Sequence, residues 1–256
     1  MVTLKSGKEL EKMRRAGRLV AECHALVQEA IRPGVTTGEL DRIVAEHLRS
    51  RGAKSPFLHY RVPGAPPFPS SICASVNEVI VHGIPGRRAL KEGDIISVDI
   101  GAILDGYVGD SAWTYGVGQI SARAQGLLEV TQGCLWAALD QARTGKRTGD
   151  IGHAIQSYAE SRGYGVVRKY ISHGVGRKLH EDPEIRNYGE PGKGIVLRPG
   201  MTLAVEPMIT EGTYESREIG DGWTVVTLDG KLSAHFEHTI AVTPEDEPEI
   251  LTLRVA

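Results

Sequence analysis

The sequence DIISVDIGAILDGYVGD, residues 94–110, predicts a β-hairpin that carries two aspartates on one face. Its apolar runs flank Asp105-Gly106, a dipeptide typical of two-residue hairpin turns. Such a loop pairs residue 101 with Asp110. Because side chains alternate between the two faces of a strand, Asp99 and Asp110 are expected on the same face as diagonal neighbours.

This pair of aspartates favours a metal site. Two like charges so close together are unfavourable unless a cation lies between them. The alternative is a pair of solvated strand aspartates. Val98, Ile100 and Val108 indicate a buried sheet instead, where a carboxylate without a partner is costly.

Two glutamates form a second acidic pair inside apolar segments. Glu206 lies in TLAVEPMI and Glu237 lies in AHFEHTIAV. Pro207 biases the backbone of Glu206 towards an extended conformation. The alternative for each glutamate is a buried ion pair with one of the arginines.

Three histidines complete the set of candidate ligands, and two of them, His82 and His173, directly precede a glycine. His173 begins HGVGRKLHEDP, His180 follows seven residues later, and His82 lies in VIVHGIP. A lone histidine is usually structural, yet imidazole is also a common metal ligand. Four carboxylates with one or two histidines suit a paired site for Mn, Fe, Co or Zn, whereas a closed structural zinc site prefers Cys and His.

The chain contains an internal repeat. Two pairs of segments match, and the second pair aligns Asp99 with Glu206; the pairs are RPGVTTGELDRIVAEHLRSRG (32–52) with RTGKRTGDIGHAIQSYAESRG (143–163), and LKEGDIISVD (90–99) with LRPGMTLAVE (197–206). Chance identity between short segments is the alternative. The repeat predicts a single α+β domain, residues 1–256, built from related halves of about 6–117 and 121–253.

Periodicity supports the same order of elements in each half. Apolar residues recur at intervals of three and four over residues 6–31, which predicts a helix. Further helices are predicted over 36–52, 122–142 and 149–162. Thr36 and Glu39 have the spacing of a capping box. Strands are expected around 72–81, over 94–117 and within 166–253, and the segment 53–71, with five prolines, is expected to be irregular.

Composition argues against several classes of protein. The 30 basic and 32 acidic residues leave a formal charge of −2, so no global field attracts nucleic acid or a membrane surface. Three widely spaced cysteines are too few for a disulfide framework. The sequence shows neither the apolar core of a signal peptide nor a run long enough for a membrane span. We therefore expect a cytoplasmic protein.

Taken together, these motifs resemble the type I methionine aminopeptidases. The resemblance covers nearly the whole chain and rests on NEVIVHGIP, the aspartate hairpin, HGVGRKLHEDPEIRNY, AVEPM, GWTVVTLDG and FEHTI. It implies the pita-bread fold, in which helices cover a curved, mostly antiparallel sheet with a dinuclear metal site at its centre.

The resemblance also implies a role for each candidate residue. Two divalent metal ions would be held by Asp99, Asp110, His173, Glu206 and Glu237, with Asp110 and Glu237 bridging. Glu206 would transfer a proton, while His82 and His180 would contact the substrate and stabilise the tetrahedral intermediate. The walls of the methionine pocket would include Tyr60, Cys73, Leu179 and Trp223.

The implied function is removal of the initiator methionine from nascent polypeptides when the next residue is small. A cytoplasmic monomer is expected, and contact with the ribosome is a further hypothesis. Prolidase and aminopeptidase P share the metal set, but they carry a long N-terminal domain, and only about 80 residues precede His82 here. Type II enzymes insert a helical subdomain between Glu206 and Glu237, which are 31 residues apart here. Non-enzymatic relatives typically lose ligands that this chain has kept.

Some positions depart from the family pattern. Ser172 replaces the usual glycine before HGxG, Leu179 replaces an aromatic residue, and the 56–71 loop looks longer than is common. A further conflict concerns Trp223. A two-residue turn at Asp229-Gly230 would pair it with Phe236 and direct it away from the face of Glu237, so either the register shifts there or Trp223 does not line the pocket.

Overall fold

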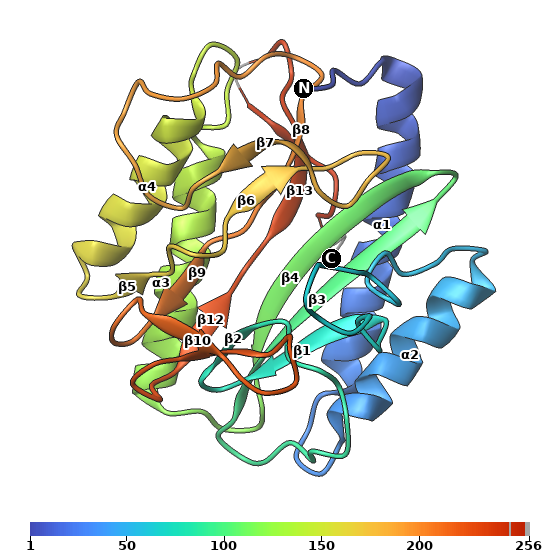
Figure 1. Cartoon of the computed structure of the whole chain (residues 1–256), viewed down its shortest axis with the longest axis vertical. Helices are drawn as coiled ribbons and strands as arrows, with labels where there is room; N and C mark the ends of the chain where they lie inside the picture. The colour runs from blue at the N-terminus through green and yellow to red at the C-terminus, as the bar shows by residue number, and fades with distance from the viewer. Residues whose placement is uncertain (246, 254–256) are drawn as a thin grey trace.

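The structure, a computed structural model, describes residues 1–245 and 247–253. The predicted domain of residues 1–256 therefore includes four positions, 246 and 254–256, that lie outside the described residues. Two pairs of helices flank a central group of strands (Figure 1); the helices are α1 (Gly7–Ala30), α2 (Thr37–Ser50), α3 (Ala122–Leu139) and α4 (Thr148–Glu160). Each predicted helix is present, and the observed boundaries differ from the predicted ones by up to three residues.

The capping box predicted at the start of α2 is present. The Thr36 hydroxyl accepts a hydrogen bond from Glu39 N at 3.2 Å, and Glu39 Oε2 accepts one from Thr36 N at 2.7 Å. Two backbone N–H groups that the helix leaves unpaired are thereby satisfied.

The strands form four antiparallel sheets. Their bounds are β1 (Ile72–Val76), β2 (Val79–Val81), β3 (Ile95–Leu104), β4 (Tyr107–Gly116), β5 (Gly165–Val166), β6 (Ser172–Gly174), β7 (Glu181–Ile185), β8 (Thr202–Val205), β9 (Met208–Thr210), β10 (Ser216–Glu218), β11 (Val225–Thr227), β12 (Ser233–His235), β13 (His238–Ala241) and β14 (Glu249–Ile250). The strand orders are β1-β3-β4, β10-β11-β2, β12-β9-β5 and β14-β13-β8-β6-β7. The mixture of helices and strands and the antiparallel strand pairing agree with the α+β fold class predicted from the sequence.

The aspartate hairpin has the predicted register. Gly101 pairs with Asp110, and Leu104 pairs with Tyr107 across the turn. Asp105 and Gly106 both have positive φ values, 51° and 78°, as a type I′ turn requires.

The second helix of each pair, α2 or α4, begins in the same way, as the predicted repeat would lead one to expect. Thr36 forms an isolated β-bridge with Ala89 ahead of α2, and Arg147, 111 positions later, forms one with Val196 ahead of α4. The backbone N–H groups of Gly38 and Gly149, also 111 positions apart, each donate to a loop carbonyl, at 2.9 and 3.0 Å. The division into two related halves stays a prediction.

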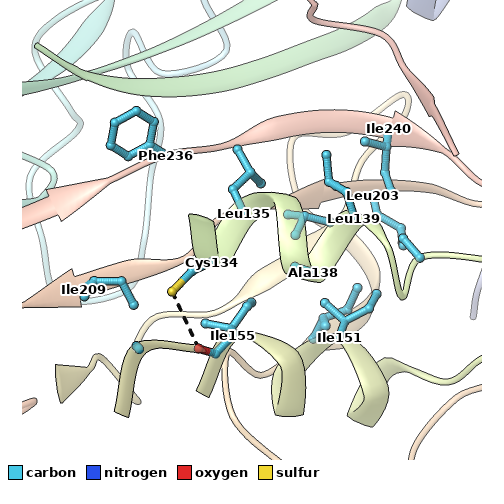
Figure 2. Close-up of a cluster of buried hydrophobic side chains, with 14 of the residues drawn as sticks. Cys134, Leu135, Ala138, Leu139, Ile151, Ile155, Leu203, Ile209, Phe236 and Ile240 are labelled. Atoms are coloured by element: carbon cyan, nitrogen blue, oxygen red, sulfur yellow. Dashed lines mark hydrogen bonds between the residues drawn. The ribbon is translucent and has the colours of Figure 1, made fainter. Parts of the chain in front are cut away.

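Each helix pair buries its apolar face against its own strands. Figure 2 shows Leu135 and Leu139 of α3 lying between Ile155 of α4 and the strands that carry Leu203 and Ile240. The Cys134 thiol donates to the Ile155 carbonyl at 3.6 Å. Truncating a fully buried leucine such as Leu135 to alanine costs about 2–5 kcal/mol.

The predicted pairing of Trp223 with Phe236 is wrong. Strand β11, which follows Trp223, pairs with β10 and β2, while β12 pairs with β9. Asp229 accepts hydrogen bonds from Thr213 N and Lys231 N, so the turn redirects the chain between sheets and does not close a hairpin. Within residues 1–245 and 247–253, no helix is long and apolar enough to cross a membrane.

Candidate metal centre

The contact between β4 and β13, called the seam below, brings Asp110 next to Glu237, which directly precedes β13. Glu237 N donates to the carbonyl of Ala112 at 2.8 Å, and Asp110 N donates to the hydroxyl of Thr239 at 3.0 Å. That hydroxyl donates in turn to the Asp110 carbonyl at 2.7 Å. Asp110 and Glu237 are both buried, and their positions depend on backbone contacts rather than on flexible loops.

His173 of β6 joins these two carboxylates. One ligand atom of each of Asp110, His173 and Glu237 lies within 4.8 Å of the other two. His173 Nδ1 is 2.9 Å from the carbonyl of Gly174, to which it can only donate. Its Nε2 therefore keeps a free lone pair and is 3.3 Å from Glu206 Oε1. A histidine whose second nitrogen is fixed in this way is typical of metal ligands.

All residues singled out from the sequence line a single cavity of about 770 Å³. Asp99 and Glu206 contribute to its wall together with the three clustered residues. The remaining members are His82, His180, Tyr60, Cys73, Leu179 and Trp223. Residues that are up to 177 positions apart in the chain, Tyr60 and Glu237, thus face the same space.

Burial makes the four carboxylates hard to ionise together. It raises the pKa of Asp99 to about 7. Burial and then the charge of Asp99 raise the pKa of Asp110 well above its ordinary value. Burial and the neighbouring carboxylates, Asp110 first, do the same to the pKa values of Glu206 and Glu237. A cation among them would restore the ionised forms.

The donor atoms present fit divalent metal ions. Among the described residues, the buried atoms Asp99 Oδ1, Asp110 Oδ1 and Glu237 Oε1 have no hydrogen-bond partner. Burial lowers the pKa of His173 to about 3, so its imidazole is neutral and can bind a metal. Four carboxylates and one imidazole suit Mn, Fe, Co or Zn. Unsatisfied buried oxygens are rare without such a reason.

Two further histidines lie beside this cluster. The ring of His180 is 4.4 Å from that of His173, and its Nδ1 is 2.7 Å from the Tyr60 hydroxyl. His82 packs edge-on against Trp223 with ring centroids 6.1 Å apart. Burial, and then the charge of His180, lowers the pKa of His82 to about 4. Both histidines are placed to contact a molecule in the cavity.

The apolar part of the cavity is formed partly by the proline-rich loop. Trp223 Nε1 donates to the carbonyl of Pro66 at 2.8 Å, and its ring packs edge-on against Phe68. Cys73 and Leu179 belong to the same apolar cluster and are buried. Trp223 therefore lines the pocket. This agrees with the family resemblance and disagrees with the register predicted from a two-residue turn at Asp229-Gly230.

Sequence reasoning missed two residues of the site. His235 lines the cavity, and its Nε2 is 3.7 Å from Glu206 Oε2. Tyr170 packs edge-on against His82 with centroids 5.5 Å apart. Alternation could have found His235, because it lies two residues before Glu237 in AHFEH. Tyr170 is in an irregular loop, where no periodicity applies.

The sequence profile of metallopeptidase family M24 matches residues 11–244, most of the chain. The chain belongs to metallopeptidase family M24. It is 52% identical to methionine aminopeptidase 1 of Bacillus subtilis over 252 residues, which cover 98% of this chain and 99% of the relative. It is 47% identical to the methionine aminopeptidase of Clostridium perfringens, with 99% of each chain covered.

Solved structures of the M24 family show the same fold. The crystal structure of methionine aminopeptidase from Rickettsia prowazekii superimposes with a TM-score of 0.95 and 43% identity, covering 99% of this chain and all of that one. The pita-bread fold is thereby confirmed. An Xaa-Pro dipeptidase from Bacillus anthracis gives a TM-score of 0.77 at 21% identity, and only 61% of its chain is covered. At this identity the likeness shows a common fold and nothing further.

Proposed function

We propose that this metallopeptidase removes the N-terminal methionine of nascent polypeptides when the next residue is small. The main support for this proposal is that one cavity contains both the carboxylate–histidine cluster and an apolar pocket. The free α-amine of a substrate would meet the acidic cluster while the first side chain enters the pocket. This arrangement accounts for cleavage at the N-terminus only.

We propose two divalent metal ions, held by Asp99, Asp110, His173, Glu206 and Glu237. The family resemblance implies that Asp110 and Glu237 would serve both ions, and both lie close to His173. Bound in pairs, such ions activate a water molecule as nucleophile and polarise the scissile carbonyl. The proposal includes Co, Mn, Fe or Zn as the metal, because the donor set alone does not distinguish them.

The protein's own groups would handle the proton and the developing charge. Glu206 would accept a proton from the attacking water and deliver it to the leaving amide nitrogen. When the Tyr60 hydroxyl donates to His180 Nδ1, the neutral ring carries its proton on Nε2. His180 and His82 would then donate hydrogen bonds to the substrate carbonyl or scissile amide.

The pocket would select methionine by shape and polarity. Tyr60, Cys73, Leu179 and Trp223 provide apolar surface with one buried thiol. The neutral thiol persists because burial, and then the neighbouring carboxylates, raise the pKa of Cys73 well above its ordinary value. An unbranched thioether adapts to such a lining better than a branched or charged side chain.

Peptide hydrolysis tests this function directly. The chelator-treated protein is reloaded with Mn²⁺ or Co²⁺ and given Met-Ala-Ser, N-acetyl-Met-Ala-Ser and Ala-Pro-Ser. We expect release of methionine from the first peptide only, and only with metal. Glu206→Gln should be inactive, while Glu129→Gln, on the exposed face of α3, should match the wild type. Cleavage of the acetylated or the Ala-Pro peptide in preference would overturn the proposal.

We further propose that the enzyme works as a cytoplasmic monomer at the ribosome. Support comes from the family resemblance and from the substrate class, since nascent chains are made there. Sedimentation of the purified protein, alone and with ribosomes, tests both statements. A stable dimer would contradict the first, and no co-sedimentation at low salt would contradict the second.

A further inference from the structure

Glu206 lies at a break between two strands. It follows β8 (Thr202–Val205) and precedes Pro207 and then β9 (Met208–Thr210). Residue 206 therefore belongs to no strand ladder, and Pro207 has no N–H to contribute. A buried backbone N–H or carbonyl without a partner is costly, so the backbone of Glu206 needs partners from elsewhere.

Two buried side chains provide those partners. The hydroxyl of Ser172 accepts a hydrogen bond from Glu206 N at 2.9 Å and donates one to Asn187 Oδ1 at 2.8 Å. Asn187 Nδ2 donates to the carbonyl of Glu206 at 2.9 Å. Ser172 and Asn187 are both completely buried. The three bonds form a closed ring around the backbone of one residue.

This ring couples two candidate metal ligands. Ser172 immediately precedes His173 in β6, and the side chain of His173 reaches Glu206 Oε1 with Nε2 at 3.3 Å. The ring also fixes the Asn187 amide, because its oxygen faces a hydroxyl donor and its nitrogen faces a carbonyl acceptor. The glycine usual at position 172 in the type I enzymes has no hydroxyl and could not form this ring.

We propose that Ser172 and Asn187 are positioning residues that hold Glu206 and His173 together as ligands of the same metal ion. This inference rests on the proposed function, which assigns these two ligands. Neither residue lines the cavity. Loss of partners that orient metal ligands typically weakens metal affinity by about 10–100-fold.

The test is a Co²⁺ titration of chelator-treated protein, followed by visible absorption. We expect Ser172→Ala to weaken one of two binding steps about 10–100-fold and to leave the other near wild type. Asn187→Ala keeps the bond between Ser172 and Glu206 N, so it should weaken the same step less. The double variant should lose little more than Ser172→Ala, since both residues act through one backbone segment.

Thr148→Val is the matched control. Thr148 is also a buried residue whose hydroxyl accepts a backbone N–H, that of Ile195 at 3.1 Å, and it lies at the start of α4 outside the cavity lining. It should lose stability yet bind Co²⁺ like the wild type. In the reloaded enzyme, Ser172→Ala should lower kcat for Met-Ala-Ser with KM nearly unchanged.

Two results would overturn the inference: Ser172→Ala and Asn187→Ala both titrating like the wild type, or Thr148→Val weakening Co²⁺ binding as much as they do. The titration uses no peptide. Failure of the wild type to release methionine would therefore refute the proposed function alone and leave the positioning role to be decided by metal binding.

Discussion

Asp99 should destabilise the metal-free protein at neutral pH and stabilise the metal-loaded one. Burial raises its pKa from 3.8 to about 7. A carboxyl group whose pKa is raised by folding destabilises the folded protein once it ionises. This destabilisation is absent at a pH below the pKa of the unfolded state, grows as the pH rises between the two pKa values, and is complete above the pKa of the folded state. Three pH units at about 1.4 kcal/mol each give a penalty of about 4 kcal/mol.

Asp99→Asn removes this penalty without changing the shape of the side chain. After treatment with chelator, we expect the variant to exceed the wild type in free energy of unfolding by an amount that grows from pH 4 to pH 8, towards about 4 kcal/mol. The charge of Asp99 also raises the pKa values of Asp110, Glu206 and Glu237, so its removal eases their ionisation and adds to the difference in the same direction. With Mn²⁺ present the order should reverse, because the variant has lost a ligand.

Denaturant unfolding at several pH values, with chelator and with metal, measures this difference. Asp105→Asn is the control, because Asp105 is in the exposed turn of the same hairpin and contacts Arg15 at 2.8 Å. An exposed ion pair is worth about 0–1 kcal/mol, so this variant should differ little from the wild type. A difference for Asp99→Asn that does not change with pH, or a wild type more stable in chelator, would refute the reasoning.

Three further substitutions test individual roles. Asp110→Asn should lower metal occupancy at both sites, whereas Asp99→Asn should affect mainly one; equal stoichiometries in calorimetric titration would contradict the bridging role. His180→Ala should reduce turnover with metal content near wild type, and a loss of metal as large as that of His173→Ala would reverse the two assignments. Leu179→Phe should narrow the pocket and lower kcat/KM for norleucine and leucine peptides relative to methionine peptides. An unchanged ratio with a lower Tm would mean that the phenylalanine merely overpacks the core, at about 1–3 kcal/mol.

Local chemistry made the hairpin and helices predictable. Asp105-Gly106 fixes both the turn and the register, so the position of Asp110 opposite Gly101 follows from two residues. The capping box at Thr36 defines the start of α2 in the same way. In these cases the interactions that decide the structure lie within a few residues of one another.

Long-range contacts limited the prediction elsewhere. Asp229-Gly230 is an equally good turn signal, yet the strands beside it pair with β2 and β9 in different sheets. Which partner a strand chooses depends on packing across the whole domain. Similarly, the ring of Ser172 and Asn187 joins residues 15 and 34 positions apart, and no local pattern in the sequence indicates it.

The candidate ligands come from two distant parts of the chain. Asp99 and Asp110 belong to the β3–β4 hairpin, while His173, Glu206 and Glu237 come from later in the chain, and the β4–β13 seam holds the two groups together. A metal ion bound by both groups would link these two parts of the fold. A ligand that binds only the folded protein at 100 times its Kd adds about 2.7 kcal/mol to stability. Metal supply should therefore influence the fraction of the enzyme that is folded as well as its activity.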